Sequence, residues 1–390
     1  MKIALLIERF DQFGGGLEQW TWGLARSLAE RGHGVTVLAF RAPAAAPSFV
    51  TLRLLPWHSS RLVRARTADA VLASLDIDVT HDLGISCSTS LLHPQSGSRL
   101  ANERREFLAG GPIRRLLAWA SPRRRRWLAQ LRQFEQCRYE PPADSVVIAV
   151  SSLVADDLHA WHGVTPERIR LIPNGVDTRR FTPPEPATRE RWRRHFRVVD
   201  KTVFLFSAHN PRLKGLLPLL AAFARAFSGR PEYMLIAIGA KPDRETRATV
   251  RRHQLEKSVI FPGLVADAIP YYAAADAFVL PSWHDACSLT VLEACACGLP
   301  VITTRANGVA DLLTDGREGR IIGSAGDIDA LAAALVELSR PDVRAGMAVH
   351  AAETAACHDL QHNVDAVERV YVEMSRRRQP PGPGRRGDVR

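Results

Sequence analysis

Short apolar runs alternate with amphipathic stretches along most of the chain. Lys2 to Ile7 is a nearly continuous apolar run, as expected of a strand that is buried on both faces of a parallel sheet. Apolar residues at helical spacing follow from about Leu17 to Arg31, and Val35 to Phe40 is the next apolar run, so the chain is predicted to open with a βαβ unit. Further strands are predicted near residues 146–151, 168–173, 203–207, 234–238, 259–261, 277–280, 301–303 and 320–322. The pattern predicts an α/β protein with doubly wound parallel sheets.

The segment from Pro281 to Thr304 predicts a strand, a polar loop, a helix and a second strand. The free backbone N–H groups and the positive dipole end of such a helix favour an anion, most often phosphate. Asp285 lies in the loop and Glu293 lies two turns further along, beside the expected anion pocket. An acid beside a phosphate is unfavourable unless it binds another group, and the usual group is a sugar hydroxyl.

These residues resemble the retaining GT-B glycosyltransferases of glycosyltransferase family four. The family signature is a glutamate, seven residues, and a second glutamate that continues into A-x-A-x-G-x-P-V; here Glu293 to Val301 matches, and Asp285 replaces the first glutamate. The resemblance implies that Asp285 meets the hydroxyls of the transferred sugar and that Glu293 holds the nucleotide ribose. It also implies that the backbone at Ser288, Leu289 and Thr290 binds the pyrophosphate. The expected fold is therefore GT-B: two facing Rossmann-like domains with a cleft between them.

The length of 390 residues also suggests two domains. The family carries the run Ile172 to Asp177, I-P-N-G-V-D, at its interdomain junction. We therefore expect an acceptor-side domain over residues 1–177 and a nucleotide-sugar-binding domain over 178–360. A helix over 361–377 is expected to return to the first domain. The tail over 378–390, rich in Pro, Gly and Arg, is expected to be disordered.

Two loops supply further candidates for the donor site. A glycine loop follows the first strand, and in the resemblance Gly15 and Gly16 let the backbone approach the donor phosphate. One alternative is that the loop is only a tight turn. The other is a dinucleotide oxidoreductase, but this chain lacks the last glycine of that family's G-x-G-x-x-G motif and an acid to bind the ribose. The loop after residue 207 carries Arg212 and Lys214, which in the family neutralise the pyrophosphate. A solvated loop is the alternative.

A histidine is a further candidate site residue. Two strand ends, near residues 78–82 and 90–94, are predicted on the same side as the glycine loop. The family places a histidine near the reacting sugar, and His93 matches it; His81 and Asp82 form a local alternative. The other alternative is a hydrogen-bonded histidine without a role at the site.

Charge is concentrated in one segment of a chain with a net charge of +11. Eleven arginines and three glutamates lie between residues 99 and 138, where an amphipathic helical insertion is predicted with a break at Ser121-Pro122. Arg123, Arg124, Arg125, Arg126 and Trp127 would suit an anionic membrane interface. Nucleic acid is not expected as a partner because no recognition module accompanies the charges. A solvated insertion is the other alternative.

No metal and no cofactor are expected. The D-x-D segments at 76–78 and 327–329 are interpreted as a strand start and a helix start, and Cys295 and Cys297 diverge on their helix. The chain lacks a long apolar span or a signal-peptide pattern, so a cytoplasmic protein, peripheral on the inner face of the membrane, is expected.

Together these features predict a hexosyltransferase, most like lipopolysaccharide core glucosyltransferases. It would move a hexose, with glucose favoured, from a nucleotide diphosphate sugar, with UDP favoured. The acceptor would be an anionic, lipid-linked or lipopolysaccharide core glycan. The alternatives are a mannosyl or other hexosyl transferase for glycolipid or capsule synthesis, and an inactive nucleotide-sugar-binding protein.

Overall fold

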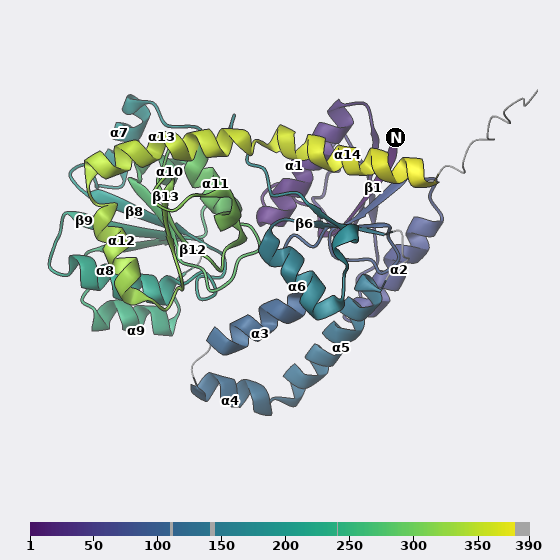
Figure 1. Ribbon diagram of the computed structural model, residues 1–390, viewed down its shortest axis with the longest axis horizontal. Helices are drawn as coiled ribbons and strands as arrows, with labels where there is room; N and C mark the ends of the chain where they lie inside the picture. The colour runs from purple at the N-terminus through teal and green to yellow at the C-terminus, as the bar shows by residue number, and fades with distance from the viewer. Residues whose placement is uncertain (110–111, 141–144, 240, 379–390) are drawn as a thin grey trace, which may run out of the picture.

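The computed structural model describes residues 1–109, 112–140, 145–239 and 241–378, and its ribbon forms two lobes (Figure 1). The predicted fold class is confirmed, because each lobe is built on one parallel sheet, of seven strands in the first and six in the second. Residues 110–111 of the basic insertion and residues 379–390 of the predicted tail lie outside the described residues.

The first lobe has strand order β3-β2-β1-β4-β5-β6-β7. Apolar side chains of β1, α1 and α14 share one core, which includes Leu5, Leu24 and Tyr371. The apolar pattern predicts neither β3 nor α2; β3 is a short and mostly exposed edge strand. The elements are β1 (Lys2–Arg9), α1 (Gly16–Glu30), β2 (Gly34–Arg41), β3 (Thr51–Leu54), α2 (Arg61–Ala73), β4 (Val79–Asp82), β5 (Leu91–Leu92), α3 (Arg99–Ala109), α4 (Pro112–Ala120), α5 (Pro122–Tyr139), β6 (Val146–Ala149), α6 (Ser152–His162) and β7 (Ile169–Leu171).

The second lobe has strand order β10-β9-β8-β11-β12-β13. Helices cover its sheet, and phenylalanines of β8 and α8 pack in its core. The elements are α7 (Pro186–His195), β8 (Thr202–Ser207), α8 (Leu216–Phe227), β9 (Tyr233–Ile238), α9 (Arg244–Arg252), β10 (Val259–Gly263), α10 (Ile269–Ala274), β11 (Ala277–Leu280), α11 (Leu289–Ala296), β12 (Val301–Thr304), β13 (Gly319–Ile322), α12 (Ile328–Glu337), α13 (Pro341–Cys357) and α14 (Leu360–Arg378).

In both sheets the strand order reverses beside the first strand in sequence, between β1 and β4 and between β8 and β11. Ligands of open α/β sheets bind at the carboxyl ends of the strands at such a switch point. The loops after β1, β4, β8 and β11 are therefore the places where a ligand site is expected.

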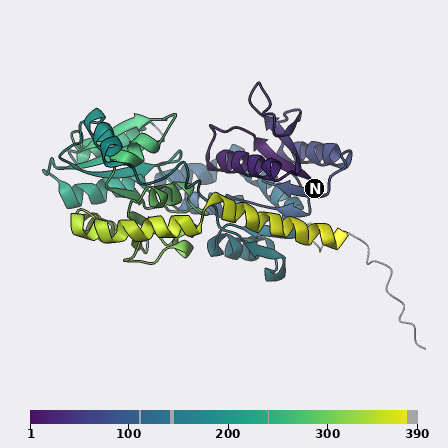
Figure 2. The same ribbon diagram turned by 90° about the horizontal axis from the view of Figure 1, so that it is seen from above.

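The chain crosses between the lobes twice, and the two crossings are bonded to each other. The Val176 N–H donates to the His358 carbonyl (3.0 Å), and the Leu360 N–H donates to the Val176 carbonyl (2.9 Å). Gly175 lies so close to the second crossing that a Cβ there would be 2.8 Å from the Leu360 Cα. After this point α14 packs on α1 and β4, and Figure 2 shows α13 and α14 running end to end along both lobes.

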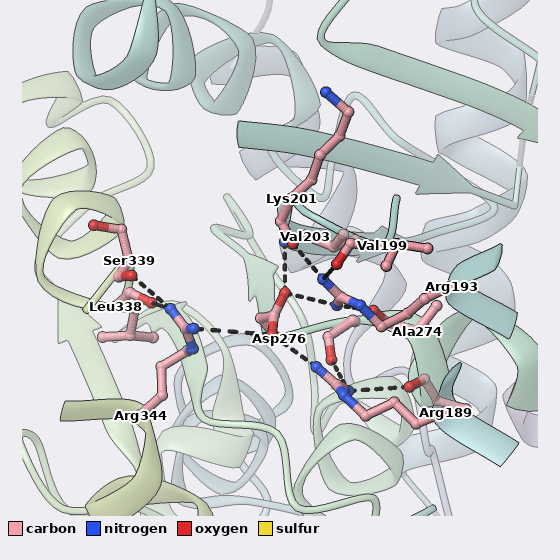
Figure 3. A network of polar contacts seen from close by, with 12 residues as sticks. Arg189, Arg193, Val199, Lys201, Val203, Ala274, Asp276, Leu338, Ser339 and Arg344 are labelled. Atoms are coloured by element: carbon pink, nitrogen blue, oxygen red, sulfur yellow. Dashed lines mark hydrogen bonds and ion pairs between the residues drawn. The ribbon is translucent and has the colours of Figure 1, made fainter. Parts of the chain in front are cut away.

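A cluster around Asp276 holds the far end of the second sheet (Figure 3). Its carboxylate binds Arg189 (2.7 Å) and Arg193 (3.0 Å) of α7, and it accepts a hydrogen bond from the Val203 N–H (2.8 Å). Arg344 of α13 approaches it to 3.9 Å. Because Asp276 precedes β11, this cluster lies at the amino ends of the strands. It ties two helices to the sheet and lies away from the switch point.

Candidate active site

The candidate site lies where the loops after β8 and β11 meet the glycine loop after β1. Figure 1 places α11 on the side of the second lobe that faces α1. The contact is close: a Cβ on Gly16 would be 2.9 Å from Leu289 Cδ1, and one on Gly15 would be 3.9 Å from His209 Nδ1. The missing side chains therefore allow the two lobes to approach here.

Lys214 and Asp285 form an ion pair at the carboxyl ends of β8 and β11. The Lys214 Nζ lies 2.6 Å from the Asp285 Oδ2 and also donates to the His284 carbonyl (3.2 Å). The two side chains are only 21% and 14% exposed, so the pair is partly shielded from water. The structure thus brings a fixed cation and an acid together at the switch point, where the cation could stabilise a negative charge that develops on a ligand.

Arg212 lies in the same loop but turns away from Asp285. Its guanidinium binds Glu245 and approaches the Asp243 Oδ2 at 3.4 Å, both at the start of α9. These acids raise the pKa of Arg212 against the effect of its burial, which is the largest influence. To reach a pyrophosphate beside Lys214, the arginine would have to leave these partners.

The amino end of α11 provides free backbone donors. Ser288 precedes the helix without capping it, since its Oγ is hydrogen-bonded to the Thr290 Oγ1 (3.0 Å). The first N–H groups of a helix have no acceptor within the helix, so those of Leu289 and Thr290 suit an anion. Asn307 accepts a hydrogen bond from the Ser288 N–H (3.3 Å) and fixes the loop.

Glu293 is half-buried one turn further along α11. The Tyr272 hydroxyl donates to its Oε2 (2.7 Å) and fixes the direction of the carboxylate. Burial raises the pKa of Glu293, while the bond from Tyr272 and the charge of Arg180 lower it. A carboxylate held in this way is an acceptor poised for hydroxyl donors of a ligand.

His93 lies at the carboxyl end of β5 in a buried cluster. Its Nδ1 is 3.1 Å from the His81 Nε2, and the His81 Nδ1 is 2.6 Å from the hydroxyl of Tyr371 on α14. Trp20 of α1 meets the His93 ring edge-on at 4.9 Å. Both members of the histidine pair that the sequence offered as alternatives are thus in one hydrogen-bonded chain.

Asp82, the other alternative, has a structural partner. Its Oδ1 accepts three backbone N–H bonds, from residues 84–86, and its Oδ2 lies 3.0 Å from an Arg138 nitrogen. The two side chains are 0% and 5% exposed, so this is a buried ion pair at the end of β4. Asp82 therefore holds the loop before β5 in place.

Three site residues have no signal in the sequence. His284 precedes Asp285 and is buried, and neither of its ring nitrogens has a hydrogen-bond partner within the described ranges. Burial lowers the pKa of His284 to about 3, with smaller contributions from Arg105 and Lys214. Tyr272 and Asn307 are the others: they reach the site from neighbouring elements, and only the three-dimensional fold brings them there.

Two half-buried arginines of the first lobe have no side-chain partner within the described ranges. The side chains of Arg61, at the start of α2, and Arg99, at the start of α3, form no ion pair or hydrogen bond among the residues that the structure describes. Burial lowers the pKa of both; nearby arginines lower it further, whereas Glu8 and Glu135 raise it. Partly buried cations without an ion-pair partner suit an anionic ligand.

The basic insertion forms α3, α4 and α5, which extend from the first lobe (Figure 1). The predicted break is where α4 ends at Ala120 and α5 begins at Pro122. Large apolar side chains of α4 are exposed, Leu117 by 67% and Trp119 by 71%. Arg123, Arg125 and Arg126 are exposed, whereas Arg124 turns back over the Phe107 ring (4.8 Å) and Trp127 is half-buried. Within the described ranges, every helix is too short or too polar to span a bilayer.

The two D-x-D segments have local roles. Asp78 accepts a hydrogen bond from the Lys2 N–H (2.7 Å), and Asp76 pairs with the Lys2 ammonium. Asp327 caps α12 by accepting from the Ala330 N–H (3.0 Å). The aspartates of both segments therefore stabilise the ends of local secondary-structure elements.

Comparison with known proteins assigns the family. Residues 14–180 match the family model described as Glycosyltransferase Family 4, and residues 200–340 match the one described as Glycosyl transferases group 1. The chain belongs to glycosyltransferase family four. It is accordingly an enzyme of the hexosyltransferase class, and the resemblance stated from its motifs is confirmed.

Relatives of this family-four enzyme vary in what they act on. It is 29% identical over 257 residues to a D-inositol 3-phosphate glycosyltransferase of Corynebacterium jeikeium, a match that spans 63% of this chain and 60% of that protein. It is 28% identical to a probable transglycosylase of Burkholderia thailandensis over 92% of both chains. A mannosyltransferase of Mycolicibacterium hassiacum is 26% identical over 87% of this chain and 89% of that protein.

Solved structures agree on the GT-B fold. WaaG, a glycosyltransferase involved in lipopolysaccharide biosynthesis, superposes with a TM-score of 0.78 at 23% identity, covering 95% of this chain and 99% of that one. HepE of Anabaena, solved with UDP-glucose, superposes with a TM-score of 0.73 at 17% identity, covering 96% and 100%. At these identities the likeness concerns the fold alone.

Proposed function

We propose that the protein is a retaining hexosyltransferase that uses a UDP-sugar, with glucose as the favoured sugar. The observation that carries this proposal is the Lys214–Asp285 pair, 2.6 Å apart, beside the uncapped start of α11 and opposite the glycine loop. A diphosphate at this position would meet the Lys214 ammonium and the first N–H groups of α11. HepE, which has the same fold, binds UDP-glucose.

The division of roles follows from the direction of each side chain. Asp285 would exchange its lysine partner for sugar hydroxyls when the diphosphate draws Lys214 away. Glu293, fixed by Tyr272, would accept the ribose hydroxyls. Lys214, joined by Arg212 once it leaves Glu245, would stabilise the charge that develops on the nucleoside diphosphate as the bond to the sugar breaks.

A thermal-shift screen of UDP, GDP and ADP sugars tests the donor. We expect UDP-glucose to raise the melting temperature and Glu293→Ala to abolish this rise, while Glu353→Ala, which removes an exposed glutamate of α13, leaves it unchanged. Stabilisation by GDP-mannose alone would instead favour the mannosyl alternative, which the mannosyltransferase relative supports. Binding without slow donor hydrolysis would favour an inactive nucleotide-sugar-binding protein.

The acceptor is proposed to be an anionic glycan on a lipid, such as a lipopolysaccharide core. Arg61 and Arg99 are partly buried cations of the acceptor-side lobe that form no ion pair within the described ranges, so they suit a phosphate or carboxylate of the acceptor. The exposed Trp119 and Leu117 beside a basic helix suit insertion at an anionic membrane surface, on the cytoplasmic face.

Vesicle flotation tests the membrane contact. We expect binding to vesicles with anionic lipid, weaker at high salt, and a loss of binding when the exposed Arg123, Arg125 and Arg126 are replaced by Ser. The matched control replaces three arginines of α9, Arg244, Arg251 and Arg252, by Ser. If both triple variants bind equally well, the insertion is a solvated one.

A further inference from the structure

Tyr371, His81 and His93 form a buried hydrogen-bonded chain that ends in a nitrogen without a partner. The Tyr371 hydroxyl is 2.6 Å from the His81 Nδ1, and the His81 Nε2 is 3.1 Å from the His93 Nδ1. The two imidazole planes lie within 9° of each other. The remaining nitrogen, His93 Nε2, has no hydrogen-bond partner among the residues that the structure describes.

Both imidazoles are neutral. Burial lowers the pKa of His81 to about 3 and places the pKa of His93 well below its ordinary value of 6.5. A neutral imidazole carries one N–H donor and one bare nitrogen that accepts. Each histidine of the chain therefore donates on one side and accepts on the other, and the whole chain has only two possible directions.

The phenol decides between the two directions. Within the described residues, the Tyr371 hydroxyl is hydrogen-bonded to His81 and to nothing else, and it is fully buried. If His81 donated to the phenol, the phenol proton would be left without an acceptor in the interior, which is costly. The hydroxyl therefore donates to the His81 Nδ1, so the proton of His81 is on its Nε2.

We propose that Tyr371 is a positioning residue: through His81 it sets the tautomer of His93, so that the His93 Nε2 carries a proton and acts as a fixed hydrogen-bond donor at the sugar site. The His81 Nε2–H donates to the His93 Nδ1, which leaves the proton of His93 on the partnerless nitrogen. The matching ligand group is an oxygen with free lone pairs, as on a sugar hydroxyl.

In this proposal α14, the helix that follows the second crossing, acts on the sugar site through His81 and His93. Tyr371 belongs to α14, which follows the interdomain crossing and packs on β4. A neutral donor selects by hydroxyl position without adding charge beside the diphosphate. The selectivity part of this inference rests on the proposed function, whereas the tautomer does not.

The tautomers can be measured directly in the ligand-free protein. Histidine labelled with nitrogen-15 and a long-range proton–nitrogen correlation separates the two neutral tautomers, and His81→Asn and His93→Asn assign the signals. We expect His81 and His93 both to be protonated on Nε2, and Tyr371→Phe to shift both, whereas Tyr233→Phe, which removes a hydroxyl of the second lobe, shifts neither. A wild-type His93 protonated on Nδ1, or signals unchanged in Tyr371→Phe, would overturn the proposal.

Donor analogues test the consequence for selectivity. We expect Tyr371→Phe to lower kcat/KM for the full donor by about tenfold, the effect of losing one well-placed hydrogen bond. In a series of donors that each lack one sugar hydroxyl, the donor without the hydroxyl that His93 contacts should have a low kcat/KM with the wild type. With Tyr371→Phe, the same donor should have a kcat/KM no lower than that of the full donor. Equal discrimination by both enzymes would overturn the role in selectivity. If no nucleotide sugar is turned over at all, the proposed function fails. The tautomer measurement would still decide whether Tyr371 sets the tautomer of His93.

Discussion

Replacing Lys214 by Met separates a catalytic role of the lysine from a structural one. The variant keeps an apolar stem and removes the ammonium that lies 2.6 Å from Asp285. Because the pair is partly exposed, its loss should cost only about 1 kcal/mol of stability, or roughly 2–4 °C in the melting temperature for a chain of this size.

The expected kinetic effect of Lys214→Met is much larger. A preorganised cation at a developing negative charge is worth about 10²–10³ in rate, because it is already in place when the charge develops. Steady-state transfer or donor hydrolysis measures kcat and KM, with Lys257→Met, an exposed lysine of the same lobe, as the control. We expect most of the loss in kcat, since the charge to be stabilised develops only in the transition state.

A kcat/KM within about threefold of the wild type would refute this reasoning, since it would leave less than 1 kcal/mol for the ammonium. A lower melting temperature with unchanged kcat/KM would refute it as well. In either case the Lys214–Asp285 pair would be a structural ion pair of the loop.

Two further substitutions test the electrostatics of the Glu293 and Asp82 carboxylates. Glu293→Gln should be more stable than the wild type at pH 8 and equal to it near pH 4. The reason is that burial raises the pKa of this carboxyl above its ordinary value of 4.5, so the ionised form destabilises the folded state, and protonation at low pH removes that cost. Melting curves across this range measure the difference, and a variant less stable at pH 8 would contradict it. Arg138→Met should cost about 3–5 kcal/mol in urea unfolding, because it leaves the fully buried Asp82 without its cation. A loss below about 1 kcal/mol would show that the three backbone bonds alone hold Asp82.

The sequence predicts best what depends on periodicity and chain order. The apolar runs locate β11 and β12, and Gly298 with Pro300 marks the end of α11, so the strand, loop and helix around Asp285 could be predicted. The parallel order of the strands then brings the loops after β8 and β11 together, which is why Lys214 meets Asp285.

The remaining features depend on contacts between distant segments. Tyr371 reaches His81 across 290 positions of the chain, and no local pattern predicts that contact. The direction of Arg212 is set by Glu245, a choice among nearby acids that spacing does not determine. β3 was missed because an exposed edge strand lacks a buried face and hence a hydrophobic signal.

The paired crossings at Val176 and Leu360 restrict how the lobes can move. The two chain segments are hydrogen-bonded side by side. They therefore allow rotation about their common axis more readily than twisting or translation of one lobe against the other. A single proteolytic cut at either crossing would leave both lobes attached by the other. A swing about this line would separate the glycine loop from α11, and it would also break the hydrogen bond from the Ser151 Oγ to the Ala286 carbonyl (2.6 Å), which joins the lobes directly.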